Sequence, residues 1–158
     1  MSESPTDSTT ESTTAGTPER DPRDLRRVTL TRDSVGRYTA RNDRGGSITL
    51  SSGTDELSPV ELLLAGIAGC TAVDVDTVTT RRAEPEQFEI EVTADKVKDE
   101  HGNHLQDIEV RFHVRFPEGD GGDAAREMLP KLVKRSHDEW CTVSRTVERG
   151  TPVTTTVE

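Results

Sequence analysis

The segment over residues 58–82 constrains the fold most, because it combines a strong helix start with a long apolar run. Ser58 is a typical N-cap residue, Pro59 suits the first helical position, and Glu61 stands three residues after the cap to complete a capping box. Residues 62–70 are apolar nearly all round, which in a helix of a soluble protein requires burial on several sides. The segment therefore predicts a long central helix that is wrapped by sheet or packed against its mate across a dimer.

Two runs of strict alternation follow this helix and predict two long strands. Apolar residues stand at every second position on both sides of a turn at residues 101–103: Phe88, Ile90, Val92 and Ala94 before it, and Ile108, Val110, Phe112, Val114 and Phe116 after it. A period of two over such lengths is typical of strands with one buried face. The two strands are expected to form a hairpin.

Shorter elements complete the expected fold. Residues 25–32, 36–42 and 47–51 resemble the strands of a small meander, and a second helix is expected from Asp123 to Arg135, with Pro130 inside it as a candidate kink. Cys141 lies at the expected start of a short helix, and residues 147–157 are predicted to form a last strand. This order predicts an α+β fold in which antiparallel sheets surround the central helix.

The first 22 residues differ in composition from the rest of the chain. They consist almost entirely of Ser, Thr, Glu, Pro, Asp and Gly, which cannot bury enough apolar surface to offset the entropy of ordering. We therefore predict a disordered acidic tail over residues 1–22 and one domain over residues 23–158.

The charge of the chain limits its partners. A formal net charge of -10, from 30 acidic and 20 basic residues, argues against a nucleic-acid partner, because phosphate recognition depends on clustered Lys and Arg. The excess of acid, the scarcity of Lys and an aromatic content of 3% indicate adaptation to salt, since molar salt shortens the Debye length to about 3 Å and removes self-repulsion. We expect a halophilic source.

Neither a membrane partner nor export is expected. No stretch approaches the roughly 20 apolar residues of a membrane span, and the N-terminus has no basic region followed by an apolar run. A cytoplasmic location follows, where two cysteines are more often free thiols or a transient redox pair than a permanent disulfide.

Cys70 and Cys141 are the only cysteines, and their pairing is the main chemical signal. A lone Cys70 on an apolar helix is most simply a small buried hydrophobic residue. Thiol redox chemistry instead needs one thiolate to attack and a second thiol to resolve the product, and the chain has one of each. A zinc site normally needs four ligands at short spacings, and only His137 lies near either cysteine. No metal and no cofactor are expected.

Two segments carry a resemblance to a known family. The first is SPVELLLAGIAGCTAVDV over residues 58–75, and the second is WCTVSRTV over residues 140–147. Together they resemble the OsmC/Ohr family of hydroperoxide-reducing thiol proteins. The resemblance implies an intertwined homodimer in which Cys70 attacks the peroxide as the peroxidatic residue and Cys141 resolves the sulfenic acid to a disulfide. A small dithiol or a thioredoxin-like protein would then restore both thiols.

The family also implies a cation that activates the attacking thiol. Family members use an Arg from the N-terminal strands held by a Glu early in the central helix, and Arg32 and Arg37 lie in the corresponding region here. Val60 occupies the position of that Glu, and Glu61 follows it, turned about 100° around the helix. Glu61 is thus either a site residue or only a member of the capping box. This departure indicates a less characterised branch of the family.

The leading hypothesis is a thiol-dependent peroxidase for organic hydroperoxides. Leu63, Ile67 and Val73 stand near Cys70 on the helix and favour apolar peroxides, since burying hydrocarbon contributes about 0.8 kcal/mol per CH₂. The alternative is a non-catalytic, stress-associated dimer that keeps the fold and binds a small apolar ligand near the cysteines.

Overall fold

The long helix predicted from the capping box is the spine of the computed structural model, which describes residues 21–53 and 55–157. This helix, α1, spans Pro59–Thr79. The Ser58 hydroxyl accepts a hydrogen bond from the Glu61 N–H at 3.2 Å, and Glu61 Oε2 accepts one from the Ser58 N–H at 2.7 Å. The predicted start is confirmed, and the helix ends three residues before the predicted limit.

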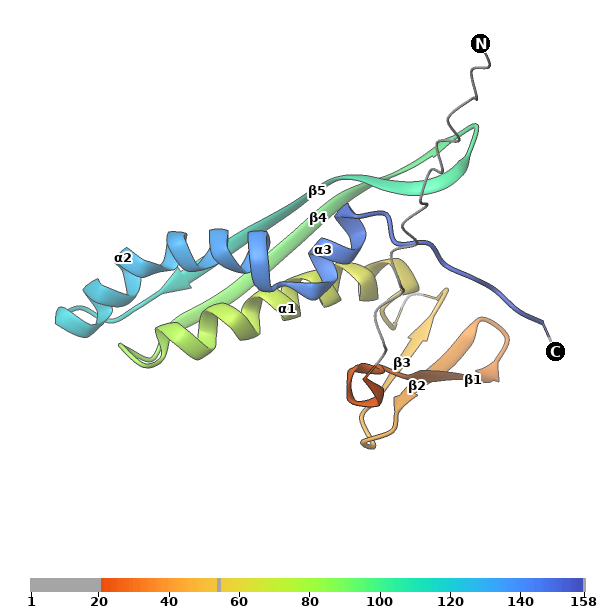
Figure 1. The fold of residues 1–158 in the computed structure, drawn as a ribbon, viewed down its shortest axis with the longest axis horizontal. Coiled ribbons are helices and arrows are strands. Elements are labelled where there is room, and N and C mark those ends of the chain that lie inside the picture. Colours follow the sequence, from red (N-terminus) through yellow and green to blue (C-terminus); the bar gives the residue numbers. More distant parts are fainter. Residues whose placement is uncertain (1–20, 54, 158) are drawn as a thin grey trace, which may run out of the picture.

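The predicted hairpin is confirmed as two long antiparallel strands, β4 (Gln87–Asp99) and β5 (Gly102–Arg115). Their register pairs Phe88 with Val114 and Ile90 with Phe112, which places the apolar positions of both strands on one face. α1 lies along β4 on this face (Figure 1). The alternation in the sequence thus reports a sheet covered on one side by α1.

A separate three-stranded sheet precedes α1. It contains β1 (Val28–Ser34), β2 (Arg37–Asn42) and β3 (Ser47–Ser51), paired antiparallel in the order of the sequence. A single 3₁₀ turn, η1 (Pro22–Asp24), leads into β1. Figure 1 shows this sheet beyond the N-terminal end of α1, away from the hairpin. β1 is exposed along its whole length.

The C-terminal part returns along α1 as three consecutive helical segments. They are α2 (Asp120–Arg135), a single turn of π-helix η2 (Ser136–Trp140), and α3 (Thr142–Glu148). Where they meet α1 lies a small core of fully or nearly fully buried side chains: Ile67, Thr71, Val75, Thr79, Ala125, Ser136 and Cys141.

The start of α2 corrects the sequence prediction. The helix begins at Asp120, three residues before the expected cap at Asp123, because Gly119 takes the N-cap position with a φ of 107° that favours glycine. The Asp123 N–H donates to the Gly119 carbonyl at 2.9 Å and so belongs to the first turn. Pro130 lies inside the helix, as expected.

The predicted last strand over residues 147–157 is wrong. α3 continues through Glu148, and residues 151–157 run on without pairing to any described strand. The Thr- and Val-rich sequence has strand propensity, but propensity alone does not supply a neighbouring strand to satisfy the backbone. The short helix expected at Cys141 is confirmed, with Cys141 as its N-cap.

Two expectations about the ends and the membrane need separate comment. The predicted tail covers residues 1–22, and of these, residues 1–20 lie outside the described part of the chain. By length and composition, α1 could cross a membrane, with a hydropathy of 1.5, so the expectation that no stretch approaches a span is wrong by that criterion. Core helices of soluble domains meet the same criterion. Only 22% of the most apolar 18-residue stretch of α1 is buried within this chain.

Candidate active site

The structure brings Cys70 and Cys141 together. Cys70 lies in the middle of α1 and is half-buried, whereas Cys141 lies between η2 and α3 and is fully buried. Both are free thiols, and they lie close enough for each to shift the pKa of the other. Two sulfur atoms from distant parts of the chain therefore share one site.

Cys141 is the better place for a negative charge. Burial opposes a thiolate here, but Ser144 stabilises it through a hydroxyl 3.1 Å from Sγ and an N–H 3.4 Å from Sγ. Together with the side chains of Thr71 and Cys70, these donors outweigh burial, so that the pKa of Cys141 is lowered from its ordinary value. Ser144 was not among the predicted site residues. It stands three residues after the N-cap, a spacing that could have revealed it.

Cys70 keeps its proton more readily. Burial raises the pKa of the Cys70 thiol, and the neighbouring Cys141 raises it further, although the backbone N–H groups of Val143 and Thr142 act in the opposite direction. As the pH rises, Cys141 is therefore expected to lose its proton before Cys70.

A second set of hydrogen bonds connects the backbone of Cys141 to α1 through Ser136. The Cys141 N–H donates to the Ser136 carbonyl at 2.7 Å, which closes the π-turn of η2. The Ser136 hydroxyl is fully buried and donates to Asp74 Oδ2 on α1 at 2.7 Å. Sequence reasoning missed Asp74 and Ser136, because they are far apart in the chain and carry no motif of their own.

The predicted charged residues lie elsewhere in this chain. Arg37 forms an ion pair with Glu56 at 2.5 Å, which lowers the pKa of that carboxyl. Arg32 is exposed on β1, opposite Tyr38 in the three-stranded sheet. Glu61 accepts the backbone N–H of Ser58, and this bond lowers its pKa. Within the single chain, Arg37 and Glu61 bond to nearby residues, and the side chain of Arg32 is exposed.

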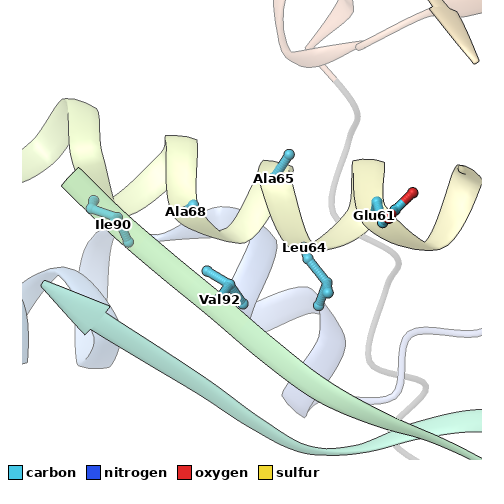
Figure 2. A pocket seen from close by; sticks show the side chains of 6 residues that line it. All are labelled: Glu61, Leu64, Ala65, Ala68, Ile90 and Val92. Carbon is cyan, nitrogen blue, oxygen red and sulfur yellow. The ribbon is translucent and has the colours of Figure 1, made fainter. Parts of the chain in front are cut away.

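Several hollows lie beside α1, and two of them are relevant to the site. An open one of about 320 Å³ lies between α1 and β4, with Glu61 on its rim and Leu64, Ala65, Ala68, Ile90 and Val92 lining it (Figure 2). A smaller one, of about 100 Å³, is lined by Ile67, Ile108, Val110, His137, Ser144, Val147 and Glu148. The smaller hollow is apolar on most sides and adjoins the thiol pair through Ser144.

Over residues 21–53 and 55–157, no group of three His, Cys, Asp or Glu side chains is placed to hold a metal ion. His137, which was considered as a zinc ligand alongside Cys141, has its Nε2 3.4 Å from Glu148 Oε1.

Solved structures share this architecture. A hypothetical protein from Aquifex aeolicus VF5 is 24% identical, with a TM-score of 0.64, and the match covers 81% of this chain and 90% of that one. An OsmC-like protein of unknown function from Vibrio cholerae is 17% identical, with a TM-score of 0.63 and coverage of 78% and 94%. An OsmC-like protein from Mycoplasma pneumoniae is 16% identical, with a TM-score of 0.60 and coverage of 78% and 87%. These identities support the fold alone.

The sequence itself supports a family. No curated protein matches the chain closely enough to count as a relative. Residues 52–156, which contain both cysteines and every helix from α1 onward, match the family model described as OsmC-like protein. The chain therefore belongs to the OsmC-like protein family.

Proposed function

We propose that this protein is a thiol-dependent peroxidase that reduces organic hydroperoxides through Cys70 and Cys141. The observation that carries the proposal is the proximity of the two thiols in a partly enclosed site, where each shifts the pKa of the other. Proximity of two reduced thiols is what a resolving step needs, because a disulfide forms only when the sulfurs can meet.

The reaction begins with a proton transfer within the pair. Cys70 is the more accessible thiol, and the Cys141 thiolate accepts its proton. The Cys70 thiolate then attacks one peroxide oxygen, the O–O bond breaks, and the organic fragment leaves as an alcohol after protonation. Cys70 is now a sulfenic acid, oxidised by two electrons.

Cys141 completes the cycle as the resolving residue. Its sulfur attacks the Cys70 sulfur, water leaves, and a disulfide joins the two residues. A small dithiol or a thioredoxin-like protein reduces the disulfide by exchange and becomes oxidised in turn. We place this cycle in the cytoplasm, where reductants of this class are abundant.

The substrate class follows from the hollow beside Ser144. Its aliphatic lining, from Ile67 on α1, Ile108 and Val110 on β5 and Val147 on α3, suits a hydrocarbon group. Each buried CH₂ contributes about 0.8 kcal/mol to binding, so an alkyl or aryl hydroperoxide gains affinity that hydrogen peroxide cannot.

A homodimer is part of the proposal. Leu63 is 40% exposed and Val73 is 67% exposed on α1, while Val28 and Leu30 are 67% and 54% exposed on β1. Exposed apolar side chains on both α1 and β1 favour burial of these two elements against another protein surface. Assembly also offers a place for the predicted activating cation: a guanidinium from the three-stranded sheet, Arg32 or Arg37, beside Cys70 in the assembled protein.

The dimer has its own test, by sedimentation. Val73→Glu places a charge on the exposed side of α1 and is expected to yield monomers. Val153→Glu, at a residue 88% exposed in the C-terminal segment, is the matched control and should leave a dimer. A wild type that sediments as a monomer would contradict this part of the proposal.

The peroxidase activity is tested by stopped-flow consumption of cumene hydroperoxide with dithiothreitol as the reductant. Cys70→Ser should abolish consumption. Cys141→Ser should permit one oxidation of Cys70, trapped as a dimedone adduct of the sulfenic acid, without forming the internal disulfide. Undiminished consumption by Cys70→Ser would exclude the mechanism, and equal rates with hydrogen peroxide would exclude the apolar preference.

A second candidate is the non-catalytic dimer that binds a small apolar ligand. The raised pKa of Cys70, caused first by burial, favours it, because a protonated thiol is a poor nucleophile. The same stopped-flow experiment separates the two candidates, since a pure binding protein would consume no peroxide even with both cysteines present.

A further inference from the structure

A buried serine at the junction of α2 and η2 makes two bonds that converge on the thiol site. Its hydroxyl donates to Asp74 Oδ2 at 2.7 Å, and its carbonyl accepts the N–H of Cys141 at 2.7 Å. This residue, Ser136, has no exposed surface. One small residue thus connects α1 to the segment that carries the second thiol.

The hydrogen bond from Ser136 also reaches the neighbourhood of Cys70, because Asp74 lies on the same helix. It stands four residues after Cys70 on α1, so the two side chains share one side of the helix, about one turn apart. A path then runs from Cys70 along α1 to Asp74, across to Ser136 and on to Cys141. Its two ends are neighbours, because each thiol shifts the pKa of the other. The links from Ser136 to Asp74 and from Cys141 to Ser136 are both hydrogen bonds of 2.7 Å.

We propose that Asp74 and Ser136 are positioning residues for the thiol pair, and that their hydrogen bond holds Cys141 against Cys70 in both the reduced and the oxidised protein. This inference deepens the proposed function by naming the residues that place the resolving thiol. Neither residue touches the peroxide.

The chemistry of the two residues suits this role. A hydroxyl that donates to a carboxylate forms a charge-assisted bond, stronger and more directional than a bond between neutral groups. Packing alone would be satisfied by alanine at position 136, whereas a buried hydroxyl must find a partner. The π-turn widens the helix by one residue at this point, and such turns are frequent at functional sites.

The effect of the Asp74–Ser136 hydrogen bond, called the clamp below, can be measured without any peroxide. In a dithiothreitol redox buffer, the two protein thiols and oxidised dithiothreitol exchange to give the protein disulfide and reduced dithiothreitol, with electrons and protons balanced. Loss of the clamp frees Cys141 in the reduced protein, so that closing the disulfide must order it again. Ser136→Ala and Asp74→Ala should each lower the equilibrium constant about tenfold, which raises the reduction potential by about 30 mV.

Three further variants separate a positioning role from simple loss of stability. Asp74→Asn keeps an acceptor oxygen and should remain near the wild-type potential. The double variant Asp74→Ala/Ser136→Ala should match either single variant, because both remove the same bond. Thr79→Val is the matched control: it removes a fully buried hydroxyl that bonds to Val75 on the same helix, and it should lower the melting temperature but not move the potential.

Wild-type potentials for both Ser136→Ala and Asp74→Ala would overturn the proposal, as would additive shifts in the double variant or an equal shift in Thr79→Val. Failure of the proposed function is recognised separately, as a wild type that forms its disulfide in the redox buffer but does not react with cumene hydroperoxide.

Discussion

Replacing Ser144 with alanine should make the thiolate of Cys141 harder to form. The wild-type Sγ has the Ser144 hydroxyl at 3.1 Å and the Ser144 N–H at 3.4 Å, and alanine removes the first while keeping the second. Hydrogen bonds to charged groups contribute about 1.5–3 kcal/mol, and sulfur is a weak acceptor, so the lower value applies. About 1.5 kcal/mol corresponds to roughly a tenfold change in the proton equilibrium.

The assay is the absorbance of the thiolate near 240 nm as the pH is raised, which needs no reagent to reach a buried sulfur. A Cys70→Ser background isolates Cys141, and adding Ser144→Ala should move the titration to higher pH, so that any given thiolate fraction requires a proton concentration about tenfold lower. In a Cys141→Ser background the same substitution should leave the titration of Cys70 nearly unchanged. An identical titration with and without Ser144 in the first background would refute the argument.

The same bond links stability to pH. Because the folded state lowers the pKa of Cys141, mainly through Ser144 against the opposing effect of burial, the thiolate stabilises folding above the unfolded pKa. That contribution is lost as the pH falls through the lowered folded pKa. Ser144→Ala should therefore cost more stability in alkaline than in acidic buffer, which chemical unfolding at two pH values would detect.

The remaining predictions concern the scaffold. Ser58→Ala removes the acceptor for the Glu61 N–H and should cost about 1 kcal/mol, or about 3 °C in melting temperature by calorimetry; an unchanged melting temperature would contradict the capping role. Gly122→Ala places a Cβ 1.8 Å from the Pro117 carbonyl oxygen, and the unfolding free energy measured in denaturant should fall by about 3 kcal/mol or more, whereas a neutral result would show that the packing of α2 is misdescribed. With a net charge of -10, the melting temperature should rise from dilute buffer to molar KCl, and full stability in dilute buffer would argue against adaptation to salt.

Most of the architecture could be predicted because its determinants are local. The capping box at Ser58 and Glu61 depends on residues three positions apart, and the alternation in β4 and β5 needs only the pleat of a strand. The prediction failed where local preference and tertiary context differ. Residues 147–157 have the composition of a strand but lack a partner among the described strands, and α2 begins early because Gly119 accepts a backbone conformation that other residues avoid.

The site divides in the same way. A resemblance in sequence predicted that Cys70 and Cys141 act together, and the structure places them close enough for each to shift the pKa of the other. The bond from Ser136 to Asp74 could not be predicted, because it depends on the angle at which α2 returns to α1. Arg32 and Arg37 could be placed on strands from the sequence, but the position of their sheet relative to α1 is a tertiary property.

The contact between α1 and the start of α3 also has a consequence for the resistance of the protein to heat. A disulfide between Cys70 and Cys141 would close a loop of roughly 70 residues, and in the chain-entropy model such a crosslink restricts the unfolded ensemble by about 4 kcal/mol. The oxidised protein would then unfold at a higher temperature than the reduced one. If the proposed cycle operates, its disulfide would also protect the chain, and the share of protected molecules would be largest when reductant is scarce.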